Sequence, residues 1–423
     1  MSSDYRKLLF GIVLAGSMLA PSLHGHAQNV TSPYSILGIG DIDNRDYGRF
    51  FSSGSASLAR RSENAYNYAN PASLTGLPFK TMHFDVALMG RSSTYLTPWA
   101  DTATLPDKDL VVKRVSMAFK VNNHAAFAFG LRPYSSVNYS FSQQVAILDG
   151  NTTYRKYIDG SGGINSVYLS WAHTLGPRLS FGITGSWMFG SMINKTQYLG
   201  DNIQLTIKRK ETDFYYGANL QGGLQWYPDW GKSWKHRFGI TAGLATHLRG
   251  QLYTEYLQDT THIYAQWGPV HYFDLPMTVG FGYSAQIKED LSISLDAQYY
   301  DWKKQIVNYS NSYTTPNYRF SIGSEYSFRK RAYGTVFERS YLSAGAMAQQ
   351  HYLTILGNPM WDYSVSVGGG YLLARRVMLQ AGIEVGRRGK LSLSQIKENY
   401  TQFMVGLTLK DIWIGPKYTH RYD

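Results

Sequence analysis

The chain has 423 residues, of which 43% are apolar, 17% charged and 15% aromatic, with 34 Tyr and 41 Gly. It has no Cys, which excludes disulfides and thiolate metal sites. The net charge of +12 comes from scattered Lys and Arg, and because no basic run resembles an arm we expect no nucleic-acid partner. Few charges with many Tyr and Gly are untypical of a water-soluble enzyme and typical of a surface between lipid and water.

Residues 1–27 have the pattern of a secretory signal peptide. The positive pair Arg6-Lys7 precedes an apolar run at residues 8–20, and small residues lead to a cleavage site after Ala27. The apolar run is too short to span a bilayer as a helix, and no later segment has about 18 consecutive apolar residues. We therefore expect an exported protein that is not a helical membrane protein.

Residues 28–79 are expected to form a domain outside the sheet. Within it, residues 54–78 read GSASLARRSENAYNYANPASLTGLP and mix small residues with a few apolar ones. Asn70 before Pro71 favours a turn, and Pro71 suits the first turn of a short helix through Ala72. Because small residues permit close packing, this pattern favours a compact N-terminal piece.

Residues 80–423 alternate between apolar and polar side chains, which predicts β-strands. In residues 317–328, for example, aromatic and aliphatic side chains alternate with Arg, Ser, Gly and Glu. A soluble β-sandwich also alternates, but its strands are usually shorter. Strands here often reach about 10 residues, which a tilted strand needs to cross a bilayer, and a sheet in lipid must close. We predict one antiparallel transmembrane β-barrel.

The lengths of the connections predict the orientation of this barrel. In bacterial barrels short turns are periplasmic and long loops are external. Three tight turns are expected, at Asn122-Asn123, Gly176-Pro177 and Ala374-Arg375. Four longer polar loops are expected, at residues 98–109, 148–163, 251–272 and 305–315.

Residues 54–78 resemble the N-terminal hatch of the FadL/TodX family, outer-membrane channels for long-chain fatty acids and aromatic hydrocarbons. That family places an Asn-Pro-Ala motif after an Ala-rich run, as in Asn70, Pro71 and Ala72 here. The segment that starts at Asp274-Leu275-Pro276 is similar to a "Pro, then Gly-Tyr strand" segment of the family. Residues 291–304 resemble its Asp-containing strand that ends in Trp.

The resemblance implies an all-β fold: a single barrel of about 14 strands whose lumen is plugged by an N-terminal hatch. It also implies an external apolar groove, an internal pocket and a sideways exit through the wall. The position of the wall opening does not follow from any motif in this sequence.

The candidate site residues all lie in the hatch. The resemblance implies that Asn70, Pro71 and Ala72 form a gate, and the alternative is a static plug that fills the lumen. Apolar hatch residues are candidates for lining a ligand pocket, and the alternative is packing against the wall. These residues are Leu58, Tyr66, Leu74 and Leu77.

Several charged residues fall on the polar face of predicted strands and are expected to point into the lumen. They are Arg114, Lys120, Arg132, Arg319, Glu325 and Glu384. A cation there is able to hold a fatty-acid carboxylate, but we favour a network of paired charges that braces the barrel. No HExxH and no GxSxG motif occurs, so we expect no enzyme, no metal site and no cofactor.

The leading functional hypothesis is passive uptake of hydrophobic small molecules, either long-chain fatty acids or aromatic hydrocarbons, across the outer membrane. Its partners are then hydrophobic small molecules or lipids, and the outer-membrane lipid itself. The alternative is a FadL-like barrel that serves as a shuttle or scaffold in protein secretion or surface attachment, with secretion-system components as partners. In either case we expect a monomer in the cell outer membrane.

Overall fold

The computed structural model describes residues 32–97, 107–146, 153–200, 207–230, 233–259, 261–288, 290–307, 309–332, 335–373, 376–392 and 395–412. The predicted signal peptide and the predicted turn Ala374-Arg375 lie outside these ranges. No helix within them is long and apolar enough to cross a membrane.

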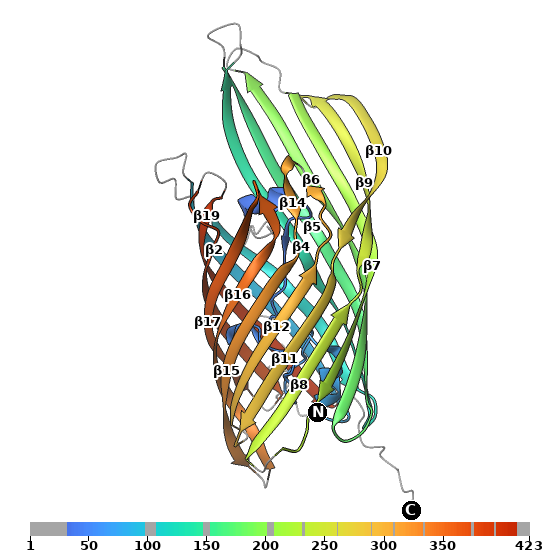
Figure 1. The fold of residues 1–423 in the computed structure, drawn as a ribbon, viewed down its shortest axis with the longest axis vertical. Coiled ribbons are helices and arrows are strands. Elements are labelled where there is room, and N and C mark those ends of the chain that lie inside the picture. The colour runs from blue at the N-terminus through green and yellow to red at the C-terminus, as the bar shows by residue number, and fades with distance from the viewer. Residues whose placement is uncertain are drawn as a thin grey trace, which may run out of the picture.

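A ring of 14 antiparallel strands forms the wall, which confirms the predicted barrel (Figure 1). Pairing runs along the chain from β2 to β8, passes from β8 to β11 and from β12 to β15, and closes where β19 pairs with β2. The ring strands are β2 (Thr81–Leu96), β3 (Asp107–Lys120), β4 (Ala125–Ala146), β5 (Thr153–Thr174), β6 (Leu179–Gly200), β7 (Ile207–Trp226), β8 (Trp234–Gly243), β11 (Met277–Ile287), β12 (Leu291–Asp301), β15 (Asn317–Ala332), β16 (Thr335–Ile355), β17 (Asn358–Leu373), β18 (Val377–Arg388) and β19 (Lys397–Ile412).

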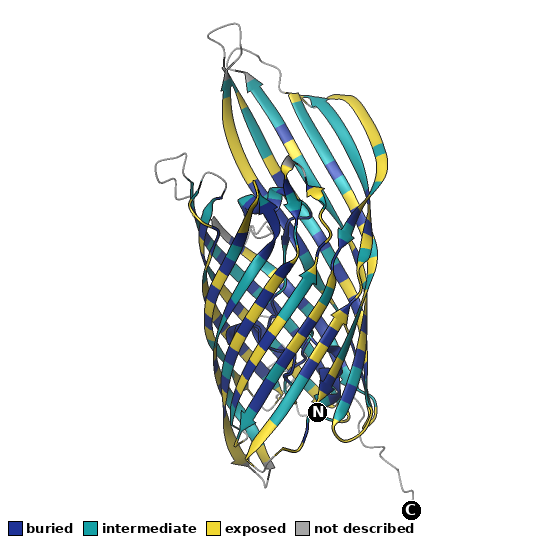
Figure 2. Cartoon of the chain, in the orientation of Figure 1, coloured by how far each residue is buried: buried dark blue, intermediate teal, exposed yellow. Residues whose placement is uncertain are grey.

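The apolar side chains of the wall face outward. In β17, Tyr363, Val365 and Val367 are 55–61% exposed, whereas Ser364 and Ser366 are each 6% exposed. The same alternation of exposed and buried positions covers the lower wall in Figure 2. An outward apolar face with an inward polar one is the pattern of a barrel whose wall meets lipid.

One side of the wall is taller than the other. β4, β5 and β6 each have 22 residues, about twice the length that a tilted strand needs to cross a bilayer. In β5 the exposed apolar residues lie in the half next to the short turn, and the exposed residues of the other half are Arg155, Asp159 and Ser161. This half of the tall side therefore stands outside the hydrocarbon, at the end opposite the short turns.

The tall side also contains β9 (Thr246–Gln258) and β10 (Thr261–Leu275), which form a hairpin. β9 follows β8 after a two-residue break and pairs with the outer half of β7. β10 leads into β11 after a break at Pro276. The prediction of a long loop at residues 251–272 is therefore wrong, because residues 251–258 belong to β9 and residues 261–272 belong to β10. Of the loop predicted at residues 148–163, residues 153–163 belong to β5, and residues 148–152 lie outside the described part of the chain.

The other predicted connections hold in part. Asn122-Asn123 and Gly176-Pro177 lie in short turns, as predicted. Of the loop predicted at residues 98–109, residues 98–106 lie outside the described part of the chain and residues 107–109 belong to β3. The predicted loop at residues 305–315 contains a small hairpin of β13 (Ile306–Val307) and β14 (Tyr309–Thr314), and β14 also pairs with β16.

The N-terminal segment, which we define as residues 32–80, crosses the interior of the barrel. It contains β1 (Asp41–Ile42), which pairs with β4, and three short 3₁₀ helices. The helices are η2 (Pro33–Ile36), η3 (Phe51–Ser53) and η4 (Pro71–Gly76). η3 contacts β15 to β18, whereas η4 contacts β3 to β7 on the other side of the ring. The segment therefore bridges opposite walls, while its role as a movable hatch stays a prediction.

Candidate functional site

All six charges that were predicted to face the lumen contact the N-terminal segment. Arg114 pairs with Asp46 at 2.9 Å, and Lys120 donates to the carbonyl oxygen of Thr75 at 2.7 Å. Arg132 and Arg319 donate to main-chain oxygens of Asp43 and Asn44. Glu325 and Glu384 accept from arginines of the segment, as set out below. The predicted network of paired charges is therefore present for Arg114, Glu325 and Glu384, whereas the other three cations bond to main-chain oxygens; both kinds of contact join the wall to the segment.

Glu325 of β15 holds two arginines of the N-terminal segment. Its carboxylate lies 2.6 Å from Arg49 and 2.5 Å from Arg60, and all three side chains are at most 5% exposed. Arg49 also pairs with Glu338 of β16 at 2.7 Å. Since a buried charge is costly without a partner, this cluster ties the segment firmly to β15 and β16.

A second cluster joins the segment to β17 and β18. Arg45 pairs with Glu384 at 2.7 Å and donates to the hydroxyl of Tyr400 at 2.8 Å. Tyr400 in turn donates to Asp362 at 2.7 Å. Asp41, four residues before Arg45 in the chain, pairs with Arg388 of β18 at 2.8 Å. Each of the five charged residues of 41–49 therefore meets an opposite charge on the wall.

The Asn70-Pro71-Ala72 motif lies against glycines of the wall. A Cβ atom at Gly182 of β6 would lie 2.6 Å from the carbonyl carbon of Pro71 and 2.7 Å from the nitrogen of Ala72. Asn70 caps η4 by accepting from Ala72, and its amide donates to the carbonyls of Leu58 at 2.8 Å and Leu224 at 3.2 Å. The motif is thus the place where the backbones of the segment and the wall come close together.

Replacing Asn70 by alanine is expected to destabilise the barrel by about 1–3 kcal/mol, because η4 loses its cap and the carbonyls of Leu58 and Leu224 each lose a hydrogen bond, although Leu58 keeps the amide of Gln225. The measurement is the temperature at which the folded band is lost in a heat-modifiability gel. Asn123→Ala, in an exposed turn, is the matched control and should not move that temperature. Equal temperatures for both variants would contradict an anchoring contribution of Asn70.

The four residues proposed to line a ligand pocket are fully packed. Leu58, Tyr66, Leu74 and Leu77 are each at most 2% exposed. Tyr66, Leu74 and Leu77 share one cluster with small wall residues of β3, β4 and β5, namely Ala118, Ala126, Ala128 and Ala172, and with Tyr168. Leu58 packs against glycines of β11. A Cβ atom added at Gly282 would lie 2.6 Å from the Cβ atom of Leu58. In this structure these side chains therefore fill space between the segment and the wall.

Apolar residues also fill the interior of the barrel near the breaks between β8 and β9 and between β10 and β11. Leu37 and Ile39 of the N-terminal segment pack with Ile164, Leu248, Leu275 and Trp302 of the wall and other residues in one cluster. Ile39 and Leu248 are 0% exposed. This cluster occupies the lumen with the protein's own side chains.

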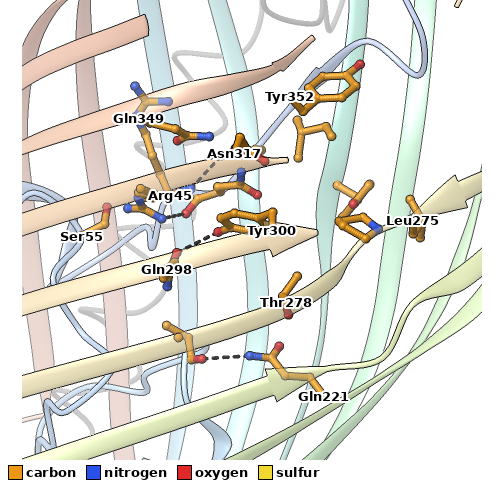
Figure 3. Close-up of a pocket in the computed structure, with 18 of the residues that line it drawn as sticks. Arg45, Ser55, Gln221, Leu275, Thr278, Gln298, Tyr300, Asn317, Gln349 and Tyr352 are labelled. Atoms are coloured by element: carbon orange, nitrogen blue, oxygen red, sulfur yellow. Dashed lines mark hydrogen bonds between the residues drawn. The ribbon is translucent and has the colours of Figure 1, made fainter. Parts of the chain in front are cut away.

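A cavity of about 180 Å³ lies between the segment and the wall. Its lining includes seven charged residues, which are Asp43, Arg45, Asp46, Arg132, Arg319, Asp362 and Arg388. Figure 3 shows Arg45 and Asn317 at this cavity, with Tyr300 donating to Gln298 at 2.7 Å. Two guanidinium nitrogens of Arg319 have no hydrogen-bond partner among the described residues, which suits a cavity that holds water. Among those residues no group of three His, Asp or Glu could hold a metal ion.

Sequence reasoning missed the residues of the segment that pair with the wall. They are Asp41, Asp43, Arg45, Asp46, Arg49 and Arg60. A signal was present, since residues 41–49 carry five charges of both signs in a chain with only 17% charged residues. Such a density in a non-strand segment indicates that the segment meets charges elsewhere.

The sequence profile of the BamG family matches residues 7–418. The chain belongs to the BamG family. No curated protein matches the sequence significantly.

Among solved structures, the FadL homologue of Pseudomonas aeruginosa superposes with a TM-score of 0.62 at 9% identity, over 89% of this chain and 100% of that one. The P. putida toluene transporter TodX gives 0.54 at 12% identity, over 88% and 99%. The CymD monoaromatic hydrocarbon channel gives 0.53 at 14% identity, over 86% and 99%. This BamG-family chain therefore has the FadL/TodX fold, as the sequence resemblance predicted.

Proposed function

We propose that this BamG-family protein is a plugged outer-membrane barrel that serves as a scaffold for another exported protein. The observation that carries the proposal is the ion-paired attachment of the N-terminal segment. Arginines at three places in the segment, Arg45, Arg49 and Arg60, are buried against carboxylates of β15 to β18. Moving the segment would separate these charges in a low-dielectric interior, which costs several kcal/mol for each broken pair.

The chemistry of the interior also favours a scaffold over a channel for hydrophobic cargo. Pockets for small apolar ligands are mostly apolar and about 300–1,000 Å³ in size. The cavity beside the N-terminal segment has about 180 Å³ and seven charged residues in its lining. A hydrocarbon there would displace water from charged groups without replacing its hydrogen bonds.

The tall side of the barrel supplies a surface on which a protein partner can dock. Short turns are expected on the periplasmic side, so the extended halves of β4 to β7, with β9 and β10, face the outside. They form a continuous paired sheet from β4 to β10 above the lipid-facing wall (Figure 1). A regular sheet is a rigid platform, which suits recognition of a folded or extended partner.

Uptake of hydrophobic small molecules is the second candidate function, and one observation favours it. The cavity reaches Leu275, Pro276 and Thr278, at the break between β10 and β11. The solved FadL/TodX-type structures with this fold include a toluene transporter and hydrocarbon channels. A lateral path at this break, gated by Asn70, Pro71 and Ala72, is the form that this proposal takes.

The two candidates predict different results when the protein is extracted from its native outer membrane in mild detergent. A scaffold is expected to co-purify with a second protein in a fixed ratio, to show no steady conductance in planar bilayers and to carry no apolar ligand by mass spectrometry. A transporter is expected to carry a hydrophobic ligand, and its deletion should slow uptake of that ligand. A bound hydrocarbon or fatty acid with no protein partner would overturn the scaffold proposal.

A further inference from the structure

The outer edge of β10 is the feature from which we draw a further inference. Within the described residues, β10 pairs with β9 along its length and with no other strand. Near the end of β10 that leads into β11, the side chain of Gln305 accepts from the main-chain N–H of Asp274 at 3.2 Å and donates to the carbonyl oxygen of Tyr272 at 3.1 Å. Irregularities interrupt the pairing of β10 with β9 between His262 and Tyr264 and between Trp267 and Val270, so the regular stretch of the edge is residues 264–267. Alternate residues of this stretch present main-chain N–H and C=O groups to an open side.

This edge lacks the charges by which natural edge strands avoid pairing. Residues 261–273 read THIYAQWGPVHYF and contain no Lys, Arg, Asp or Glu. The neighbouring strand β9, which is paired on both sides, carries Arg249 and Glu255. Natural edges are blunted with charged residues, bulges or Pro. In β10 the two irregularities and Pro269 flank residues 264–267, which themselves contain none of these devices, so pairing is permitted along this stretch.

Aromatic side chains along the edge offer contacts to a second strand. Tyr264 is 50% exposed and Trp267 is 53% exposed. The Trp267 ring lies 4.6 Å from the Tyr253 ring and 5.7 Å from the Phe214 ring, so it is held in place by the strands behind it. Rigid, half-exposed aromatic rings are common anchors at protein interfaces.

We propose that the edge of β10 binds an extended segment of another exported protein by adding a strand to the sheet. The added strand runs antiparallel to β10 and pairs over residues 264–267, because an irregularity interrupts β10 on each side of this stretch and Pro269 has no N–H to donate. Apolar side chains at alternate positions of this segment pack on Tyr264 or Trp267. The inference rests on the scaffold proposal and names the chemistry of its partner.

A second copy of this chain is a poorer occupant of the edge. Two copies in one membrane have the same orientation, so β10 of each copy runs in the same direction relative to the bilayer. Edge-to-edge contact would then be parallel, and parallel pairing is slightly less stable than antiparallel pairing. A separate chain has no such constraint and can adopt the antiparallel direction.

The test compares two lysine substitutions at positions that pair with each other across β9 and β10. Gln266 of β10 and Thr254 of β9 are directly opposite each other in the sheet. Gln266→Lys places a charge on the open edge, and Thr254→Lys places the same charge on the same face of an internal strand. The full-length variants are extracted from native outer membranes, and the amount of co-purifying protein is measured. Gln266→Asn serves as an uncharged control, and a heat-modifiability gel verifies folding of each variant.

Gln266→Lys is expected to lower the retained partner about ten-fold, as the loss of one or two main-chain hydrogen bonds would, while Thr254→Lys and Gln266→Asn retain it. Hydrogen exchange at residues 264–267 is expected to be slower in the complex than in protein stripped of its partner. A partner retained by Gln266→Lys, with unprotected amides in β10, would overturn the edge proposal and leave the scaffold intact.

Two other outcomes are informative in the same experiment. Because the chain has no Cys, Ala265→Cys carries a single attachment point for a cross-linker. An adduct that contains only this chain, either as a dimer or as an internal link, would overturn the proposal of a foreign strand. The absence of any co-purifying protein in all variants would overturn the scaffold proposal and with it this inference.

Discussion

Replacing Glu325 by leucine is expected to lower the stability of the barrel by about 3–5 kcal/mol, because it leaves two buried arginines without their shared carboxylate. Arg49 keeps Glu338, but Arg60 has no second carboxylate within 4.0 Å among the described residues. Arg60 is 4% exposed and already has one guanidinium nitrogen without a hydrogen-bond partner. The charge can regain water only if this part of the N-terminal segment leaves the wall.

Two measurements check the Glu325→Leu result. The temperature at which the folded band is lost in a heat-modifiability gel should fall by several degrees. Displacement of the segment should also open the lumen, so that the variant conducts ions in planar bilayers and the natural protein does not. Glu325→Gln keeps the shape of the side chain and loses its charge. Its melting temperature and its conductance should fall between those of Glu325→Leu and those of the natural protein.

The matched control for Glu325→Leu removes an exposed carboxylate. Asp229 pairs with Arg178 at 2.8 Å, but the two side chains are 77% and 58% exposed. Exposed pairs contribute little to stability, so Asp229→Leu should leave both the temperature and the conductance unchanged. If Glu325→Leu behaves like Asp229→Leu, the ion pairs do not hold the segment in the barrel.

A valine at Gly182 is expected to push the N-terminal segment away from the wall. Any Cβ there would come within 2.7 Å of two backbone atoms of Pro71 and Ala72, and backbone cannot move as a flexible side chain does. Forcing extra atoms into a well-packed core typically costs about 1–3 kcal/mol. The expected result is a lower melting temperature and a higher susceptibility of the segment to added protease.

Gly185→Val is the control for Gly182→Val, since both residues lie on β6. An added Cβ at Gly185 meets nothing within 4 Å, and the residue is exposed on the outer face. This variant should therefore match the natural protein in stability and protease resistance. Equal behaviour of the two variants would show that the close contact at Pro71 does not hold the segment in place.

The strength of these contacts bears on how the Asn-Pro-Ala motif acts. As a gate, Asn70, Pro71 and Ala72 would have to leave the glycines of β6 and β7 in each transport cycle. In the structure Asn70 instead bonds to both the segment and β7 through Leu58 and Leu224. We therefore propose that the motif anchors the segment, and the conductance of Gly182→Val distinguishes an anchor from a gate.

The sequence by itself determined the barrel and the direction in which its side chains point. The period of two is a local property, because successive residues of a strand face opposite sides whatever the strand pairs with. Alternation therefore predicted both the outward apolar face of strands such as β17 and the inward charges such as Glu325. The resemblance added the N-terminal plug and the number of strands.

The same local argument explains why residues 251–272 were predicted to be a loop. This part of the sheet stands outside the lipid, so neither of its faces is continuously apolar. Without an apolar face the period of two is hidden in a mixture of polar and aromatic residues. Only the pairing of β9 with β7 and of β10 with β9 shows that both segments are strands.

Tertiary structure alone decided which groups meet. Arg49 and Glu325 are 276 positions apart in the chain, and Arg45 and Glu384 are 339 apart. No local pattern specifies a partner at that distance, since each charge could pair with any opposite charge in the lumen. Ring closure fixes the position of every strand, and the path of the N-terminal segment through the ring then selects the pairs.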